Sequence, residues 1–274
     1  MPLFITSLNS GSNGNCYYIG NENEAVLIDA GISCRETEKR MKRLGLDMNS
    51  VRAIFVSHEH SDHITGIPGL SKKFQLPVYI TDATLRSASI PIEEHLVQLF
   101  FPQQPVTIGN LTITAFPKCH DASDPHSFVI SDSGVKVGVF TDIGNSCSNV
   151  IQHFSQCHSV FLEANYCEDM LATGSYPYYL KKRISGGNGH LSNKQALELF
   201  TQHRAKYLTH LILSHLSRNN NSPELVERLF NKEANGATII VASRHHETPV
   251  YCIAHESGCL PKPVSARHIQ LSLF

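Results

Sequence analysis

The chain has 274 residues, of which 41% are hydrophobic and 17% are charged, so it can bury a core and is not intrinsically disordered. Its 23 basic and 24 acidic side chains give a formal net charge of −1, which excludes a globally cationic coat for nucleic acid but leaves room for a local basic patch. No apolar run approaches the roughly 18 residues needed to cross a bilayer, and no signal-peptide pattern opens the chain, so we expect a cytoplasmic protein.

The first part of the chain predicts short strands interrupted by turns. Residues 3–8, 16–19 and 25–28 are short, β-rich apolar segments separated by glycine and asparagine. Ser33 and Glu36 form a capping box, which predicts a helix that ends near Leu44. Further strands are predicted at residues 53–56, 78–80, 111–116, 128–130 and 135–140.

The second part repeats this mixture of strands and helices. Ser192 and Gln195 form another capping box, and Ser222-Pro223 supplies an N-cap followed by a proline at the first helical position. These signals predict helices that end near Phe200 and Phe230. Strands are predicted at residues 160–162, 208–213, 238–242 and 250–253. The overall pattern favours two mixed sheets packed together with helices outside.

The eight cysteines are scattered, and no two form a C-x-x-C pair. This spacing argues against a disulfide framework or a zinc ribbon, and we expect free thiols that pack as small hydrophobic groups. The sixteen histidines are a high number for this length, so their positions carry the functional information. The cysteines are residues 16, 34, 119, 147, 157, 167, 252 and 259.

One short turn concentrates metal-binding side chains. Residues 57–63 read Ser-His-Glu-His-Ser-Asp-His and follow directly on a predicted strand. The alternative is an exposed polar turn with hydrogen-bonded histidines. So short a loop cannot bring all four candidate ligands to one ion, whereas two ions about 3.5–4 Å apart could share them. The four candidates are His58, His60, Asp62 and His63.

Three further candidate ligands lie at the ends of predicted strands, where loops on a rigid sheet place functional groups. They are His120, Asp142 and His215. Each could by itself be a capping or turn residue. Together with the turn at 57–63, they would complete two coordination shells rich in nitrogen and oxygen, including a carboxylate that can bridge.

This set, with Asp29 in Leu-Ile-Asp-Ala-Gly, resembles the metallo-β-lactamase superfamily in residue type and order. The resemblance implies an α/β (mixed α+β) fold, a four-layer αβ/βα sandwich. It implies a single domain over residues 1–274 with two similar halves, about 1–140 and 141–274. Asp29 would orient a metal ligand, or would simply form a strand-end turn. The resemblance assigns His58, His60 and His120 to one ion, Asp62, His63 and His215 to the other, and Asp142 to a bridge.

A narrower resemblance rests on strings spread over nearly the whole chain. Residues 10–16, 120–125, 176–184, 189–193 and 215–221 look like the YycJ/WalJ group of bacterial metallohydrolases, which is related to ribonuclease Z-type nucleases. The resemblance implies a 5′-exonuclease activity on double-stranded DNA and a genetic association with cell-wall signalling.

Glu163 and His190 each lie at a predicted strand or helix boundary. They resemble the acid–histidine pair of the ribonuclease Z branch, which would protonate a leaving 3′ or 5′ oxygen, and a carboxylate that orients a histidine suits proton delivery. The alternative makes Glu163 a carboxylate at the edge of the core and His190 a flank of a helix.

Basic residues near this pair are candidate phosphate contacts. Lys181, Lys182 and Arg183 form a basic run, and Arg218 follows His215 by three residues. The run could equally be a solvated helix face. The balanced net charge predicts that any DNA binding is modest and strongly dependent on salt.

Aromatic and glycine-rich segments leave alternatives open. Tyr176, Tyr178 and Tyr179 could stack on a terminal base or pack in the core. The loop at residues 10–15 could approach the site with its backbone N–H groups or could form a hairpin turn.

The sequence therefore predicts a dinuclear metal-dependent phosphodiester hydrolase, in first place a double-stranded DNA 5′-exonuclease. A hydroxide bridging the metals would be the nucleophile, and Asp62, Glu163 and His190 would have catalytic roles. The alternatives are a small ester, thioester or lactone hydrolase and a metal-bound regulatory protein with little catalysis. Zinc, manganese and iron all suit His/Asp ligands. We expect a nucleic-acid substrate, DNA before RNA, with neither a membrane nor an obligatory protein partner.

Overall fold

The first sheet is built from the N-terminal part of the chain and completed by the last strand that the structure describes. The computed structural model describes residues 1–255, so Cys259 lies outside the described residues. Strands β3 to β6 are parallel, whereas β1, β2 and β14 pair antiparallel. In spatial order the strands are β14 (Tyr251–Ile253), β1 (Leu3–Asn9), β2 (Cys16–Gly20), β3 (Ala25–Ile28), β4 (Val51–Phe55), β5 (Val78–Ile80) and β6 (Val97–Leu99).

The second sheet has the same division into an antiparallel and a parallel part. Strands β10 to β13 are parallel, and β7 to β10 pair antiparallel. Its spatial order is β13 (Thr238–Val241), β12 (His210–Ser214), β11 (Ser159–Glu163), β10 (Val135–Phe140), β9 (His126–Asp132), β8 (Leu111–Pro117) and β7 (Val106–Ile108).

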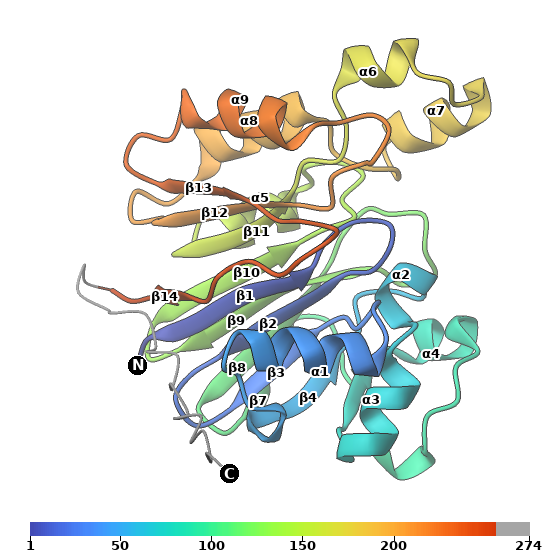
Figure 1. Ribbon diagram of the computed structural model, residues 1–274, viewed down its shortest axis with the longest axis vertical. Coiled ribbons are helices and arrows are strands. Elements are labelled where there is room, and N and C mark those ends of the chain that lie inside the picture. Colours follow the sequence, from blue (N-terminus) through green and yellow to red (C-terminus); the bar gives the residue numbers. More distant parts are fainter. Residues whose placement is uncertain (256–274) are drawn as a thin grey trace, which may run out of the picture.

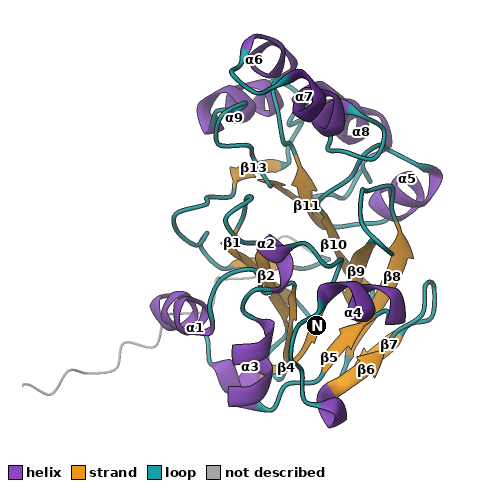
Figure 2. Cartoon of the chain, turned by 90° about the vertical axis from the view of Figure 1, so that its right-hand side faces the viewer, coloured by secondary structure: helices purple, strands orange, loops and turns teal. Residues whose placement is uncertain are grey.

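Helices cover the outer face of each sheet (Figures 1 and 2). The α-helices are α1 (Cys34–Arg43), α2 (Ser61–Ile64), α3 (Ile67–Phe74), α4 (Asp82–Ala88), α5 (Ser148–Phe154), α6 (Glu168–Thr173), α7 (Tyr178–Ser185), α8 (Asn193–His203) and α9 (Pro223–Asn231), with 3₁₀ turns at Met48–Ser50 and Glu94–Leu96. Helices α6 and α7 project from one end of the molecule (Figure 1). Within residues 1–255, no helix has the length and hydrophobicity that a membrane crossing requires.

Three hydrophobic clusters hold these layers together. One lies between the sheets, where Ile5 and Phe55 of the first sheet belong to the same cluster as Phe128 and Phe161 of the second. The other two lie between each sheet and its helices. Both faces of the central strands are therefore buried, which explains why they read as continuous apolar runs. The predicted four-layer α/β sandwich is confirmed.

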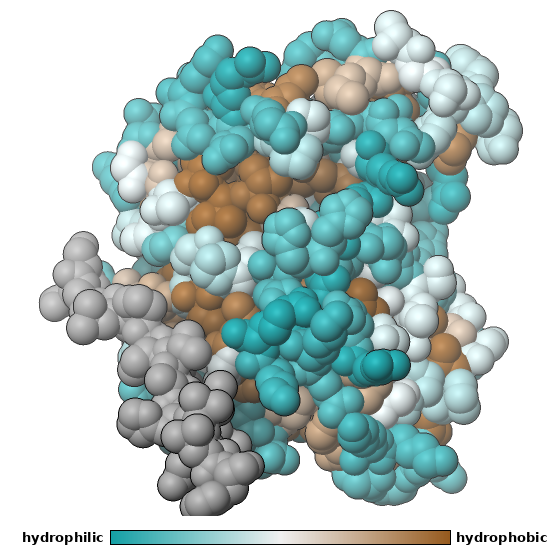
Figure 3. Space-filling view, in the orientation of Figure 1, coloured by the Kyte–Doolittle hydropathy of each residue, from teal (hydrophilic) through white to brown (hydrophobic). Residues whose placement is uncertain are grey.

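Among the described strands, β13 forms an edge of the second sheet, and its partly buried Ile239 and Val241 pack against the same cluster as Leu225 and Leu229 of α9. A hydrophobic patch is visible below α9 in the space-filling view, whereas most of this face is hydrophilic (Figure 3).

Most predicted strands and helices are present, with ends shifted by a few residues. Ser33 and Ser192 cap α1 and α8 as predicted, since they accept hydrogen bonds from the backbone N–H groups of Glu36 and Gln195. Of the two predicted capping boxes, the one at α8 is complete, whereas the side chain of Glu36 accepts from Arg40 instead of from Ser33. The chain passes from the first sheet to the second between β6 and β7, earlier than the predicted division near residue 140, and β14 returns to the first sheet. Six cysteines carry free thiols, as expected: residues 16, 34, 119, 147, 157 and 167. The expectation was wrong for Cys252, which is disulfide-bonded.

Candidate metal centre

The candidate ligands meet at one edge of the sandwich because they follow the carboxyl ends of neighbouring strands. Residues 58–63 come after β4 and continue into α2, and Asp142 comes after β10. His215 directly follows β12, and His120 lies beyond the end of β8. Carboxyl ends of parallel strands lie at the same edge of a sheet, where α/β proteins place their functional groups. The structure thus brings together all seven residues that the sequence singles out as ligands.

Two groups of side chains form within this edge. In the first, Nδ1 of His60 lies 3.1 Å from Nε2 of His58 and 3.4 Å from Nε2 of His120. In the second, Oδ2 of Asp62 lies 3.6 Å from Nε2 of His63 and 3.5 Å from Nε2 of His215. Each group has three donor atoms close enough to surround one ion.

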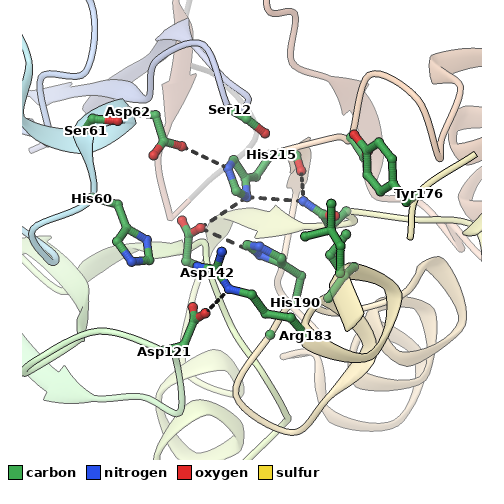
Figure 4. A pocket seen from close by; sticks show the side chains of 15 residues that line it. Ser12, His60, Ser61, Asp62, Asp121, Asp142, Tyr176, Arg183, His190 and His215 are labelled. Carbon is green, nitrogen blue, oxygen red and sulfur yellow. Dashed lines mark hydrogen bonds and ion pairs between the residues drawn. The ribbon is translucent and has the colours of Figure 1, made fainter. Parts of the chain in front are cut away.

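Asp142 lies between the two groups. Its Oδ2 is 3.1 Å from Nε2 of His63, and its Oδ1 is 3.3 Å from Nδ1 of His215 and 3.8 Å from Nε2 of His120. Its carboxylate therefore faces members of both groups, which is the position that a bridging ligand needs. Figure 4 shows Asp142 between His60 and His215, with Asp62 on the opposite side of His215.

Four buried histidines share one arrangement. One ring nitrogen of each contacts a protein oxygen, and the other nitrogen faces the cluster. A fixed outer hydrogen bond of this kind sets the tautomer and the orientation of metal-binding imidazoles. The contacts are Ser57 Oγ to His58 (2.8 Å), Asp29 Oδ2 to His63 (2.7 Å), the Gly189 carbonyl to His120 (3.0 Å) and Glu163 Oε1 to His215 (2.9 Å).

Asp29 organises two of these contacts. It is fully buried and accepts hydrogen bonds from the backbone N–H and the hydroxyl of Ser57, both at 2.8 Å, as well as from His63. Because the Ser57 hydroxyl also contacts His58, the carboxylate of Asp29 supports one histidine of each group. It is therefore in the position expected for a residue that orients ligands.

Three of these residues have left-handed backbone conformations. The φ angles of Asp29, Asp142 and His215 are 59°, 54° and 56°. Such conformations are uncommon for residues other than glycine, although aspartate and histidine adopt them more readily than most. They let the chain turn sharply as it leaves a strand, so that the side chain points into the site.

The electrostatics of the two groups differ. Burial lowers the pKa of His58 well below its usual value and that of His120 to about 4, so both are neutral imidazoles, the form that binds metals. Burial would also lower the pKa of His63, but Asp142, Asp29 and Asp62 raise it well above its usual value. The carboxylates thus stabilise a cation at the second group.

The donor set fits divalent metal ions. The buried side-chain atoms without a hydrogen-bond partner in the described part of the chain include two at the site, Oδ2 of Asp142 and Nε2 of His215, although each faces an oppositely charged group. Buried polar atoms without partners are rare unless a ligand or ion completes them. Imidazole and carboxylate donors suit zinc, manganese and iron, so the clusters are consistent with a dinuclear site.

Glu163 and His190, which the sequence pairs, are in contact. Oε1 of Glu163 lies 2.8 Å from Nδ1 of His190 and also contacts His215. Burial would raise the pKa of Glu163, but His190 and then His215 lower it to about 2, so it is a carboxylate. The side chain of His190 is 21% exposed, and it lines the cavity beside the clusters. The pair thus joins the ligand network to a surface that a substrate can reach.

A polar cavity of about 350 Å³ opens over the clusters. His60, Asp62, Asp142, His190 and His215 contribute to its wall, and the segment that contains α7 closes the opposite side (Figure 4). Tyr176 and Arg183 come from that segment, and Nε of Arg183 forms an ion pair with Asp121. Ligand groups therefore lie at the base of a cavity with both acidic and basic walls.

The basic run divides between two surfaces. Arg183 faces the metal cavity, whereas Lys181 and Lys182 line a separate shallow hollow on α7. Lys181 donates a hydrogen bond to the carbonyl of Ala172, and Lys182 lies over the ring of Tyr178. Arg218 lines a further cavity next to the metal cavity.

The tyrosines are also divided. Tyr178 and Tyr179 are each 74% exposed, so core packing does not explain them. Tyr176 lines the metal cavity, and its hydroxyl accepts a hydrogen bond from Asn219. The loop at residues 10–15 connects the antiparallel strands β1 and β2, and it also reaches the site.

The sequence analysis missed several neutral and basic residues around the ligands. Nδ2 of Asn15 lies 3.2 Å from Asp62 and 3.1 Å from His63, and Nδ2 of Asn165 donates to the backbone carbonyl of His215. Lys118 is buried and donates to the carbonyl of Thr141. Their partners lie many positions away in the sequence, so no local pattern signals them. The glycine- and asparagine-rich loop at residues 10–15 was the one local signal in the sequence. From it we predicted a role for backbone N–H groups and not for the side chain of Asn15.

Comparisons with known proteins agree with this architecture. Residues 24–215 match the family described as the beta-lactamase superfamily domain. The chain is 31% identical over 255 residues to exodeoxyribonuclease YycJ of Bacillus anthracis, covering 90% of this chain and 96% of that protein. It is 28% identical over 223 residues to exodeoxyribonuclease WalJ of Streptococcus pneumoniae, covering 80% of this chain and 83% of that protein. The metallo-β-lactamase fold protein YhfI from Bacillus subtilis superposes with a TM-score of 0.72 at 18% identity, covering 92% of this chain and 100% of that one.

Proposed function

The chain belongs to the metallo-β-lactamase superfamily of hydrolases, and on that premise we propose that it hydrolyses phosphodiester bonds in DNA, acting from the 5′ end of a duplex. The observation that carries this proposal is the placement of Asp142 between two groups of imidazole and carboxylate donors beneath an open polar cavity. Two relatives that match most of the chain are named exodeoxyribonucleases, which supports DNA as the substrate class.

The proposed ligands follow from the two groups. His58, His60 and His120 would hold one ion, and Asp62, His63 and His215 the other, with Asp142 between them. Divalent ions in such a pair neutralise the charge of a phosphate and lower the pKa of a water that serves as the nucleophile. The protein supplies fixed donors, since Asp29 and Glu163 hold ligand imidazoles in one orientation.

The chain's own acid–base chemistry would come from His190. Its Nδ1 contacts Glu163 at 2.8 Å, and its ring lines the cavity in which a phosphodiester would lie. An imidazole oriented by a carboxylate can pass a proton to a leaving oxygen, which contributes typically 10²–10⁴-fold to the rate. Arg183 lines the same cavity from the α7 side, and Lys181 and Lys182 extend the basic surface along α7 as more distant phosphate contacts.

The test uses the purified chain loaded with Mn²⁺ and a DNA duplex labelled at either its 5′ or its 3′ end. We expect stepwise release of the 5′ label, shortening of the 3′-labelled strand from its other end, and no cleavage in EDTA. His58→Ala should abolish cleavage, whereas His95→Ala, which changes an exposed histidine on a 3₁₀ turn, should not. Full metal loading without cleavage of DNA or RNA, together with rapid hydrolysis of small esters, would contradict the proposal.

A further inference from the structure

A second cavity, of about 380 Å³, adjoins the metal cavity. Its walls come from the loop between β12 and α9, which carries Arg218 and Asn221, and from the loop between β13 and β14, which carries Arg244 and His246. Neither the ligand groups nor the Glu163–His190 pair uses this space. It therefore needs an explanation of its own.

The two cavities share a wall. Ser217 lines both of them. Ser10 lines the second cavity, and its hydroxyl accepts a hydrogen bond at 2.7 Å from the backbone N–H of His215, whose side chain lines the first. A group bound in the second cavity would thus lie just across this shared wall from the proposed metal ligands.

The second cavity has positive charge without a matching carboxylate. Among the described residues, Arg218 makes neither an ion pair nor a hydrogen bond, and no acidic residue lines the cavity. Arg244 donates to the carbonyl of Leu216 at 2.9 Å. The acidic residues nearest in sequence have other partners, since Glu224 accepts from Ser222 and Glu247 pairs with Arg43. Burial, and after it the neighbouring Arg218, lowers the pKa of Arg244, so an anion would relieve repulsion between like charges.

The arginine-bearing loop is held in place by the N-terminal part of the chain. The backbone N–H of Ser10 donates to the carbonyl of Ser243 at 3.1 Å, and Nδ2 of Asn13 donates to the carbonyl of Arg244 at 2.8 Å. Nη2 of Arg40, on the buried side of α1, donates to the carbonyl of His245 at 3.0 Å. The loop therefore has a fixed conformation before a ligand binds, so association carries no entropic cost of ordering it.

We propose that this second cavity binds a phosphate group of the DNA strand adjacent to the phosphodiester that is cleaved, with Arg218 and Arg244 as its contacts. This inference rests on the proposed function, because it takes the metal cavity as the site of cleavage. Guanidinium groups suit phosphate because their planar donors match its oxygens in pairs. The phosphate could be the terminal one at the 5′ end or an internal one of the backbone, and the experiment separates these sources.

The first arm measures binding without metal, so that it does not depend on catalysis. Fluorescence anisotropy in EDTA gives the Kd of a labelled duplex over a range of salt concentrations. Each phosphate contact that is lost should reduce the slope of log K against log salt by about 0.9. Arg218→Gln and Arg244→Gln should each show this change and bind about eightfold more weakly at 0.1 M salt. Arg244→Lys should recover most of the slope because it keeps the charge.

The matched control is Arg52→Gln, which removes an exposed arginine near the N-terminal end of β4, the end away from the site. It changes the net charge equally and should leave the slope unchanged. An equal loss of slope in Arg52→Gln and Arg218→Gln would overturn the proposal, because the effect would then come from net charge alone. Unchanged slopes in both cavity variants would overturn it as well.

The second arm compares duplexes with a 5′-phosphate and a 5′-hydroxyl. If the terminal phosphate is bound, wild-type protein should prefer the phosphorylated duplex and Arg218→Gln should lose that preference. If an internal phosphate is bound, Arg218→Gln should weaken the binding of both duplexes equally. Failure of the proposed function is distinguishable: the wild-type protein would bind DNA through both arginines yet cleave none when loaded with Mn²⁺. Normal cleavage with arginine-independent binding would instead reject the cavity and leave the proposed function standing.

Discussion

Asp29→Asn tests how the chain prepares its ligands before any ion binds. The carboxylate is fully buried and accepts from the Ser57 N–H, the Ser57 hydroxyl and the His63 ring at 2.7–2.8 Å. Asparagine has nearly the same size but replaces one acceptor oxygen with an NH₂ donor. Because both carboxylate oxygens accept hydrogen bonds, either orientation of the amide places this donor against another donor.

The structure sets the expected magnitude. A buried donor left unsatisfied costs about 1–3 kcal/mol, so the free energy of unfolding of the metal-free protein should fall by about that amount. Loss of a charged partner behind a ligand histidine lowers metal affinity by roughly 10–100-fold. His63 should be affected directly, and His58 through the Ser57 hydroxyl that it shares with Asp29. Both ions should therefore bind more weakly.

Two measurements check this expectation. Competition with a chromophoric chelator gives the affinity for Zn²⁺ or Mn²⁺, and urea unfolding in EDTA gives the stability of the metal-free protein. The control is Asp169→Asn, which makes the same change on the exposed side of α6 and should alter neither quantity. Metal affinity within twofold of wild type in Asp29→Asn would refute the view that Asp29 positions the ligands.

Three other perturbations give separate readouts. Asp142→Ala should lose metal and activity together, because this carboxylate faces both donor groups; two ions per chain by elemental analysis would contradict that position. His190→Ala should keep its metal while kcat falls by about 10²–10⁴-fold, and an unchanged kcat would leave His190 with a structural role only. EDTA should lower Tm, since an ion present at 100 times its Kd stabilises the native state by about 2.7 kcal/mol, and identical melting curves with and without EDTA would argue against metal binding.

The fold was predictable where burial left a clear pattern. The strand at residues 25–28 lies between helices and the other sheet, so every position is apolar and its bounds are those predicted. Strands β6 and β7 have three residues each, with exposed or half-buried side chains, and such short segments show no periodicity. Helix α2 has four residues and no side-chain cap, and its sequence was recognisable as a ligand turn but not as a helix.

The site was predictable to the extent that its residues have characteristic local patterns. A histidine-rich turn and single residues at strand ends are visible in the sequence because the sheet edge fixes where they lie. Asn15 and Arg244 have no such pattern. Asn15 contacts a residue that lies 47 positions further along the chain, and Arg244 contacts one that lies 28 positions earlier. These contacts form only when both sheets and their loops have packed.

The same packing explains why the candidate site needs both sheets. His58, His60, Asp62 and His63 follow a strand of the first sheet, whereas Asp142 and His215 follow strands of the second. His63 therefore contacts Asp29 from its own sheet through one nitrogen and Asp142 from the other sheet through the second. Carboxylates and imidazoles that are far apart in the sequence come together only in the folded sandwich, so ions held there would bind the native state alone and stabilise the packing of one sheet on the other.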